Sequence, residues 1–342
     1  MELKDKIKRL TNAYGVSGDE FRVSEIAAEL LKPYVDKVGI DRFGNVTGYK
    51  SCGVPGAKKL LLDAHIDQIG FMITEVTDGG FLRFIGMGVD QRMLPGSEMT
   101  VLTAKGPIPG IVAALPPHLQ KPGDNEKSIP IADMAVDIGM TGDEAKKRVR
   151  VGDYMAFRGD TFDLLGGGLC GRCMDDRACF CCILHALELL QGKPLAVDLI
   201  ICASTKEEMG GHGSQAVSYR ENPDYAVAID VCHARTADAP EVQPRLGDGP
   251  VISVGSNSRP KFARLAMEVA RAKQIPFLPD ACPAGSGTNA WTMQLMREGI
   301  CTLVVSLPLK YMHSPVEVLR MNDVENVGRL LAELAQAMDG RL

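Results

Sequence analysis

Short apolar runs alternate with amphipathic segments along most of the chain. The apolar runs are rich in β-branched and aliphatic residues, as in buried strands, and the segments between them repeat apolar residues at helical spacing. This alternation predicts a mostly parallel sheet with helices on both faces. The strand-like runs are KKLLLDAH (58–65), AVDLIICAST (196–205), DYAVAID (224–230), PVISVG (250–255) and CTLVVSL (301–307), and the helical segments include ACFCCILHALELLQ (178–191), KFARLAMEVARAK (261–273) and DVENVGRLLAELAQAM (323–338).

The pattern changes between residues 71 and 164, where short strands are punctuated by glycine and proline. Segments such as SEMTVLTAKGPIPGIVAAL (97–115) and VRVGDYMAF (149–157) keep little helical period, which is typical of a small β domain. We therefore expect an α/β domain made of residues 1–70 and 165–342, interrupted by a β-barrel-like domain at 71–164. The length of 342 residues also suits two domains, at roughly 150 residues each.

The charge and composition of the chain argue against two classes of binding partner. A net charge of -5, with 24% charged residues, argues against a nucleic-acid or anionic-membrane surface, because both demand an excess of lysine and arginine. No apolar stretch approaches the roughly 20 residues that span a bilayer, and the N-terminal MELKDKIKRL is typical of a charged amphipathic helix rather than a signal peptide. We expect a cytoplasmic protein that acts on a small molecule or a peptide.

Half of the ten cysteines stand close together, in CGRCMDDRACFCC (170–182). The chain is long and rich in core residues, so reduced thiols fit better than a disulfide framework. Cys170 and Cys173 have zinc-hairpin spacing, but a second pair such as Cys179 and Cys182 falls on a predicted helix. We interpret the cluster as small side chains that pack this helix against the sheet, with a redox or adventitious-metal role as the alternative.

Acidic residues and histidines stand just past the predicted strands at five places. Because the carboxyl ends of parallel strands meet in one crevice of an open α/β sheet, these side chains are expected to converge. A mixed set of imidazoles and carboxylates without thiolate suits Zn²⁺, Co²⁺ or Mn²⁺, and a bridging carboxylate lets two ions lie roughly 3.5 Å apart. The five places are His65 with Asp67, Asp175 with Asp176, Glu207 with Glu208, Asp230, and His313.

The spacing within two of these places favours particular roles. His65 and Asp67 share a strand face, since side chains alternate with period two, so Asp67 can orient a ligating imidazole. Of the neighbours Glu207 and Glu208, one can bind metal while the other takes a proton from water. A glutamate doublet with two roles fits metal-assisted hydrolysis.

The motifs that carry these residues resemble those of a known family. The chain is similar to the dinuclear metallo-aminopeptidases that include the tetrahedral, deblocking and glutamyl aminopeptidases, some of which were formerly labelled endoglucanases. The resemblance covers nearly the whole chain and keeps the family's order and spacing. It runs through AHIDQIGFMIT, VRVGDYMAF, MDDRAC, KEEMGGHGS, AIDV, LGDGPVI, GSGTNA and MHSP.

The resemblance implies a role for each residue of the set. His65, Asp175 and Asp230 would hold one metal ion and Asp175, Glu208 and His313 the other, with Asp175 as the bridge. Glu207 would be the general base, and Asp67 would orient His65. The cofactors would be two divalent ions per subunit, zinc or cobalt, with manganese possible.

The resemblance also implies an architecture and an assembly. The catalytic part would be a phosphorylase/hydrolase-like three-layer α/β/α domain, and the inserted β-rich domain would form a homodimer. Such dimers often build a hollow dodecamer, which would restrict access to short peptides.

Two residues depart from the family's pattern. Gln68 stands where the family usually reads H-x-D-E, and Asn289 stands where it usually reads G-T-D-A. Acidic groups near an aminopeptidase crevice can hold the substrate's ammonium, so these amides bear on whether a free N-terminal amine is required. We take Gln68 and Asn289 as candidate substrate contacts, together with His233, which follows the strand of Asp230.

The leading hypothesis is a metal-dependent aminopeptidase in which Glu207 activates water for attack on the peptide carbonyl. One alternative is a metal-dependent deacylase of N-acyl amino acids or peptides, which the two amides favour. A second alternative is a non-catalytic metal-bound scaffold, although such a protein has no need of Glu207. A glycosidase is the weakest candidate, because it needs two carboxylates that flank a sugar bond rather than a chelating set.

Overall fold

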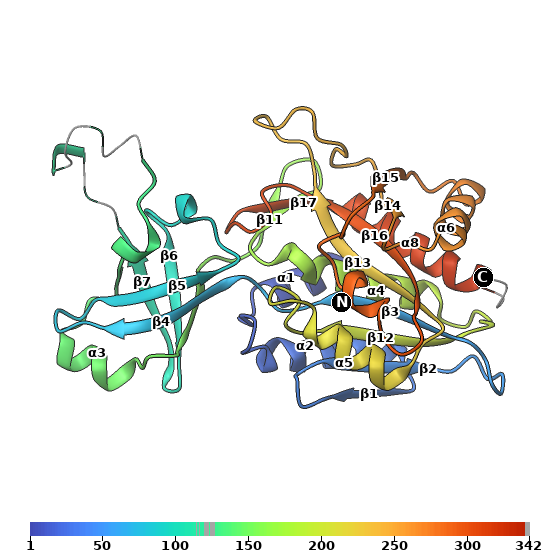
Figure 1. Ribbon diagram of the computed structural model, residues 1–342, viewed down its shortest axis with the longest axis horizontal. Coiled ribbons are helices and arrows are strands. Elements are labelled where there is room, and N and C mark those ends of the chain that lie inside the picture. The colour runs from blue at the N-terminus through green and yellow to red at the C-terminus, as the bar shows by residue number, and fades with distance from the viewer. Residues whose placement is uncertain (114, 116, 120–122, 124–126, 339–342) are drawn as a thin grey trace.

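The computed structural model describes residues 1–113, 115, 117–119, 123 and 127–338, and Figure 1 shows two parts. A larger body of sheet and helices carries residues 1 and 338, the ends of the described chain, and a smaller barrel extends from it. The mixed α/β class and the barrel predicted from the sequence are confirmed. No helix in the described residues is long and apolar enough to cross a membrane.

An eight-stranded sheet forms the centre of the body, in the order β1-β2-β12-β3-β13-β16-β14-β15. The four neighbours β12, β3, β13 and β16 run parallel, whereas β1 and β2 form an antiparallel hairpin at one edge. The bounds are Lys37–Ile40 (β1), Val46–Lys50 (β2), Asp198–Ser204 (β12), Lys59–His65 (β3), Tyr225–His233 (β13), Cys301–Leu309 (β16), Val251–Gly255 (β14) and Leu278–Cys282 (β15).

Helices cover both faces of this sheet. One face packs against the larger hydrophobic core, to which five helices contribute: α1 (Leu3–Thr11), α2 (Phe21–Leu31), α4 (Met174–Leu189), α6 (Pro260–Ala272) and α8 (Met321–Ala337). The other face packs against α5 (His212–Glu221) and α7 (Ala290–Met293). Side chains alternate along each strand, so the four parallel strands supply apolar residues to both cores.

Helix α4 lies in the interior, between the sheet and helices α1 and α8. It is apolar around most of its circumference, as a buried helix must be, and Cys179, Cys181 and Cys182 on it are fully buried free thiols. Small thiol side chains allow the helix to lie close to its neighbours. Their burial as free thiols supports the packing interpretation of the cluster.

The smaller part is a closed six-stranded barrel in the order β4-β5-β8-β7-β6-β9. Phe71 is at its centre, with the rings of Phe84 and Phe157 edge-on to it at 5.4 Å. The bounds are Gly70–Val76 (β4), Leu82–Met87 (β5), Val136–Asp137 (β8), Gly106–Val112 (β7), Glu98–Thr103 (β6) and Tyr154–Phe157 (β9), with helix α3 (Gly142–Arg148) beside them and short 3-10 turns at Lys32–Tyr34, Gln91–Met93, Pro117–Leu119 and Ile131–Asp133.

A separate three-stranded sheet joins the two parts. Strand β10 (Phe162–Leu164) pairs with β11 (Gly168–Gly171), which pairs with β17 (Glu317–Arg320). The barrel strands therefore end at Phe157, and residues 162–164, which we assigned to the inserted domain, pair with strands of the body. This sheet leads the chain directly into α4, so it sets where α4 begins.

Candidate metal centre

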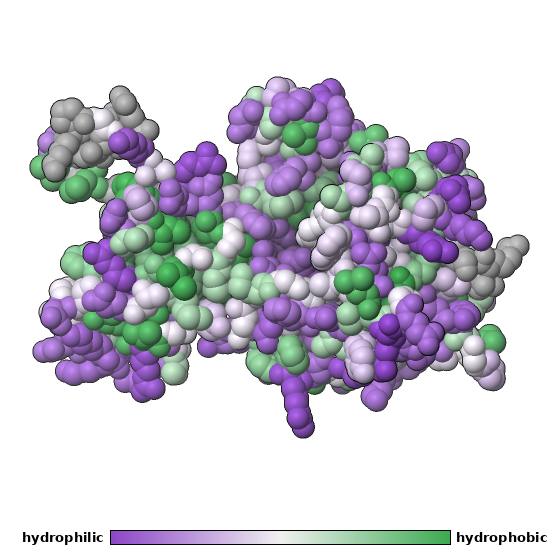
Figure 2. Space-filling model, in the orientation of Figure 1, coloured by the Kyte–Doolittle hydropathy of each residue, from purple (hydrophilic) through white to green (hydrophobic). Residues whose placement is uncertain are grey.

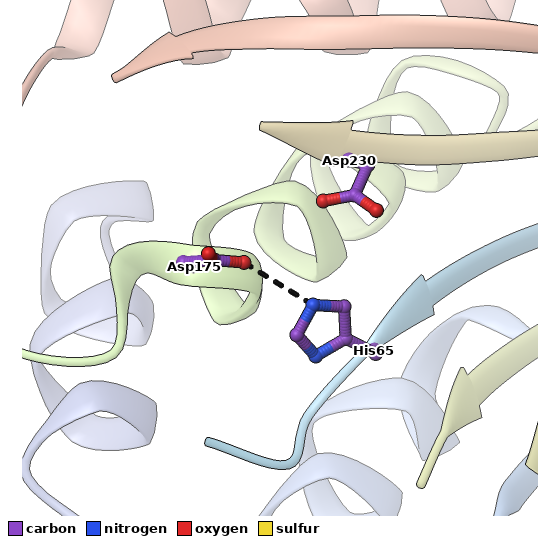
Figure 3. A group of neighbouring side chains, drawn as sticks. All are labelled: His65, Asp175 and Asp230. Carbon is purple, nitrogen blue, oxygen red and sulfur yellow. Dashed lines mark ion pairs between the residues drawn. The ribbon is translucent and has the colours of Figure 1, made fainter. Parts of the chain in front are cut away.

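The carboxyl ends of the parallel strands bring four of the five expected ligands to one place, and the start of α4 brings the fifth. His65 is the last residue of β3, Asp230 lies near the end of β13, and Glu208 and His313 follow β12 and β16. Asp175 is the second residue of α4. Figure 3 shows His65, Asp175 and Asp230 turned toward one another from three different elements.

Asp175 lies between the two histidines. Its Oδ1 is 3.2 Å from Nε2 of His65, its Oδ2 is 3.2 Å from Nε2 of His313, and that same Nε2 is 3.4 Å from Oε1 of Glu208. Two groups of ligand atoms therefore lie within 4.8 Å of one another: His65, Asp175 and Asp230, and Asp175, Glu208 and His313. In the part of the chain that the structure describes, no other such group of histidine, cysteine, aspartate and glutamate is found.

The electrostatics of the cluster favour a cation. Burial raises the pKa of Asp230 and of Glu208, and it raises the pKa of Glu207 to about 7. Hydrogen bonds with Asp175 and Glu208 raise the pKa of His313 to about 11. Without an ion, His313 holds a proton at neutral pH, which a divalent cation bound in its place would displace. An acid-rich, thiolate-free donor set of this kind fits Zn²⁺, Co²⁺ or Mn²⁺.

Asp67 is fully buried and contacts both the imidazole and the glutamate loop. Its Oδ1 is 3.4 Å from Nδ1 of His65, as expected for a carboxylate that orients a ligand. The same carboxylate accepts hydrogen bonds from the backbone N–H groups of Glu207 (3.1 Å) and Glu208 (3.2 Å). The side chain of Asp67 therefore positions one ligand of each metal group, His65 and Glu208, and also the expected base Glu207. The sequence pattern indicated only its contact with His65.

Glu207 is placed to act on the cluster without being part of either group. Its Oε2 is 4.0 Å from Nε2 of His65, and its side chain is 14% exposed. Lys206, just before it, has a φ of 57°, a left-handed conformation that non-glycine residues rarely adopt. This turn lets the adjacent glutamates point in different directions after β12 ends, so only Glu208 reaches His313.

Sequence reasoning missed Glu317, the first residue of β17. Its buried carboxylate accepts hydrogen bonds from the backbone N–H groups of Met174 (2.7 Å) and Asp175 (3.2 Å) through one oxygen, and from that of His313 (3.0 Å) through the other. It therefore ties together the two segments that carry the shared aspartate and a histidine ligand. An acid four residues after His313, inside an apolar β run, was the available signal.

Gln68 and Asn289, the two amides that depart from the family's pattern, make hydrogen bonds to other residues of the protein. The side-chain oxygen of Gln68 accepts hydrogen bonds from Arg177 (2.9 Å) and Arg172 (3.2 Å). The amide nitrogen of Asn289 donates to Asp63 (2.7 Å) and to the hydroxyl of Ser204 (2.9 Å), and its oxygen accepts from the hydroxyl of Ser214 (2.8 Å).

Gln68 and Asn289 are also both buried. Their polar atoms support the fold, and these hydrogen bonds give no support to the substrate contacts expected of them. His233, at the end of β13, is exposed and lines the crevice, so its substrate contact stays a prediction.

A crevice of about 330 Å³ opens on one side of the cluster. His65, Asp175, Glu207, Glu208, Asp230 and His313 all border it, so a molecule in the crevice reaches the metal groups and the free glutamate together. Carboxylate ligands, an adjacent glutamate outside the ligand set and an open crevice are the parts that metal-assisted hydrolysis needs.

Comparisons with known proteins agree with this chemistry. The sequence profile described as M42 glutamyl aminopeptidase matches residues 44–330. The chain is 33% identical over 338 residues to the lysyl aminopeptidase of Pyrococcus furiosus, and the match covers 97% of this chain and 96% of that protein.

Solved structures show the same relationship. A TET aminopeptidase from a marine-sediment archaeon of the Thaumarchaeota superposes with a TM-score of 0.93 at 29% identity, over 99% of this chain and 98% of that one. The TET1 peptidase of Pyrococcus horikoshii, which can assemble into a tetrahedron or a large octahedral shell, superposes with a TM-score of 0.87 at 31% identity, over 98% and 100% of the two chains. The chain therefore belongs to the M42 glutamyl aminopeptidase family and is a metal-dependent aminopeptidase.

Proposed function

We propose that the enzyme uses two divalent metal ions to remove N-terminal residues from short peptides. His65, Asp175 and Asp230 would hold one ion, and Asp175, Glu208 and His313 the other. The observation that carries this proposal is the position of Asp175, whose two oxygens face different histidines at the same 3.2 Å separation. A shared carboxylate of this kind is what a two-ion site requires.

The ions, when bound, polarise the scissile carbonyl and make water more acidic. Glu207 is the base that takes the proton from the attacking water, and it then gives that proton to the leaving amine. In the ion-free protein burial raises the pKa of Glu207 to about 7, so this carboxyl can hold a proton near neutral pH. Asp67 holds His65 and the Glu207 backbone in fixed relation, which keeps the base aligned with the site.

Assembly and location extend the proposal. We propose a homodimer formed through the barrel, and a dodecamer built from such dimers, in the cytoplasm. Ile85 and Ile111 on barrel strands β5 and β7 are 52% and 50% exposed, and Figure 2 shows apolar side chains gathered on the visible face of the barrel. Exposed apolar surface of this extent favours association. The phosphorylase/hydrolase-like three-layer description of the body belongs to the same proposal.

Neither alternative gains from the structure. The deacylase hypothesis depended on amides near the crevice, and the hydrogen bonds of Gln68 and Asn289 are made within the protein. The scaffold hypothesis leaves Glu207 without a purpose, since its carboxylate belongs to neither ligand group. Peptide substrates with a free N-terminus therefore remain the best-supported class.

Hydrolysis of aminoacyl and N-acyl-aminoacyl chromogenic amides by metal-stripped protein reloaded with Co²⁺ or Zn²⁺ tests the proposal. The two neighbouring glutamates give a matched pair of variants. Glu207→Gln is expected to keep two ions per subunit while turnover of free-amine substrates falls by about 10²–10⁴-fold. Glu208→Gln is expected to lose bound metal as well. Turnover of the N-acyl series alone would replace the aminopeptidase with a deacylase.

A further inference from the structure

The crevice beside the metal centre has two serines on its floor, and one of them lies on the strand next to a metal ligand. Ser306 on β16 is the register partner of Asp230 on β13, so their Cα atoms are about 4.8 Å apart. Ser253 on β14 comes two residues after Val251, which pairs with Ser306. The two serines are therefore diagonal neighbours, with Cα atoms about 7–8 Å apart. A molecule bound at the metal groups reaches Ser306 first and Ser253 next.

Both serine side chains point to the face of the sheet on which the crevice lies. Their chain neighbours Val305 and Ile252 pack in the core on the opposite face. Because side chains alternate along a strand, Ser306 and Ser253 face the other side, as Asp230 does. The three side chains accordingly border the same crevice.

The hydroxyls of Ser306 and Ser253 make no hydrogen bond with any residue that the structure describes. The two residues are only 7% and 5% exposed, and a hydroxyl buried to this extent normally has a partner. The hydroxyl of Ser218 on α5 also lacks a partner, but its oxygen is sealed in the interior. The oxygens of the two crevice serines are not sealed, so a group that enters the crevice can supply the missing partner.

The other side chains around the crevice favour a neutral group. Among the described residues, no lysine or arginine borders it and the acid Asp280 does, so an acidic side chain would find no counter-charge from the protein there. A carboxamide carries donors and an acceptor on separate atoms, so it can bond two hydroxyls that lie apart. It is also neutral and leaves water at a lower cost than an ammonium group.

We propose that Ser306 and Ser253 determine the specificity of this crevice, and that they bind the carboxamide side chain of an N-terminal glutamine. The proposal rests on the aminopeptidase function proposed above. With the scissile carbonyl at the metal groups, two methylene groups carry the carboxamide of glutamine about 5 Å from its Cα, which is one strand spacing. That length suits a group held between the two hydroxyls. Val304, which lies on the same face and borders the crevice, contacts the methylene groups.

Kinetics with metal-loaded full-length enzyme test this subsite. The substrates are the p-nitroanilides of glutamine and of homoleucine, whose side chain has the same shape with methyl groups in place of the amide atoms. Ser306→Ala and Ser253→Ala should each lower the glutamine-to-homoleucine ratio of kcat/KM by about fivefold, and the double variant by about 25-fold, since each removes one hydrogen bond. In the wild type these bonds should keep glutamine at least level with homoleucine, although the apolar side chain gains more by leaving water.

Ser218→Ala is the matched control, because it removes a buried hydroxyl that has no partner and lies outside the crevice. It should leave the ratio at the wild-type value. An equal fall of the ratio in this control overturns the proposal. If the metal-loaded wild type hydrolyses neither substrate, the aminopeptidase function itself fails, and this subsite with it. Hydrolysis of homoleucine with a ratio that neither Ser306→Ala nor Ser253→Ala changes removes the subsite alone.

Discussion

Asn289→Asp would restore the acid that the family's pattern usually has, and the structure predicts a pH-dependent loss of stability. Asn289 donates hydrogen bonds to Asp63 and Ser204 from one amide group. In the variant, two carboxyl groups face each other in a buried site and must share a proton. The hydrogen bond to Ser204 is lost as well, and such a bond contributes about 1 kcal/mol.

The pKa of Asp63 sets the range of pH in which this loss grows. Burial raises the pKa of Asp63 to about 6. Below pH 6 the folded wild type carries one proton on Asp63, and the folded variant carries one proton shared between positions 63 and 289. The variant should therefore be less stable than the wild type by only about 1–2 kcal/mol in this range. Above pH 6 the wild type releases its proton and the variant keeps one, because its shared pKa is higher. The folded variant then binds more protons than the unfolded chain, and the loss should grow by about 1.4 kcal/mol per pH unit, to about 4 kcal/mol at pH 8.

Urea unfolding of ion-free protein at pH 5, 6, 7 and 8 measures this dependence. Asp63→Asn combined with Asn289→Asp is the matched control, since the swap restores one amide and one carboxylate. It should recover most of the stability at pH 8, which a double-mutant cycle will report as a coupling energy. A loss that stays flat from pH 5 to pH 8, or a swap that only adds the two single losses, would refute the shared-proton argument. A rise in KM without a loss of stability would show that Asn289 contacts substrate after all.

Three further predictions concern other parts of the molecule. Glu317→Gln should weaken metal binding by about 10–100-fold in chelator competition, because an amide cannot accept three backbone N–H bonds. Gln68→Glu should place a carboxylate between two buried arginines, which lowers its folded pKa. Stability should then rise by about 1 kcal/mol above pH 4.3 and lose this gain as the pH falls through the lowered pKa, as measured by urea unfolding. Gly80→Ala should lower the stability of the barrel by more than Gly96→Ala does. Both glycines have φ near 88°, but only at Gly80 would an added Cβ meet a backbone carbonyl oxygen. Melting temperatures of the two variants measure the difference.

The sequence indicated the candidate ligands because four of the five follow a strong strand signal, and only Asp175 begins a helix instead. His65 and Asp230 end apolar runs, and in a parallel sheet such ends must converge whatever the loops do. Contacts made through the backbone carried no comparable signal. Glu317 acts on N–H groups of distant segments, and nothing in a strand's apolar pattern shows which N–H groups a buried acid will meet. For the same reason the directions of Gln68 and Asn289 could not be predicted: their positions beside the site were clear, and their partners were not.

The two arginines that hold Gln68 explain how the chain functions without an acid there. Arg177 is fully buried, and its donors go to backbone carbonyl oxygens and to Gln68. Burial lowers its pKa to about 10, so it remains charged at neutral pH. The carboxylates of Asp67 and Glu317 act on this guanidinium and oppose the effect of burial. A glutamate at position 68 would neutralise the arginines locally. With glutamine, the charge of the arginines is free to stabilise the two buried carboxylates that position the ligands. The amide of Gln68 therefore supports the metal site through these arginines rather than by contacting the substrate.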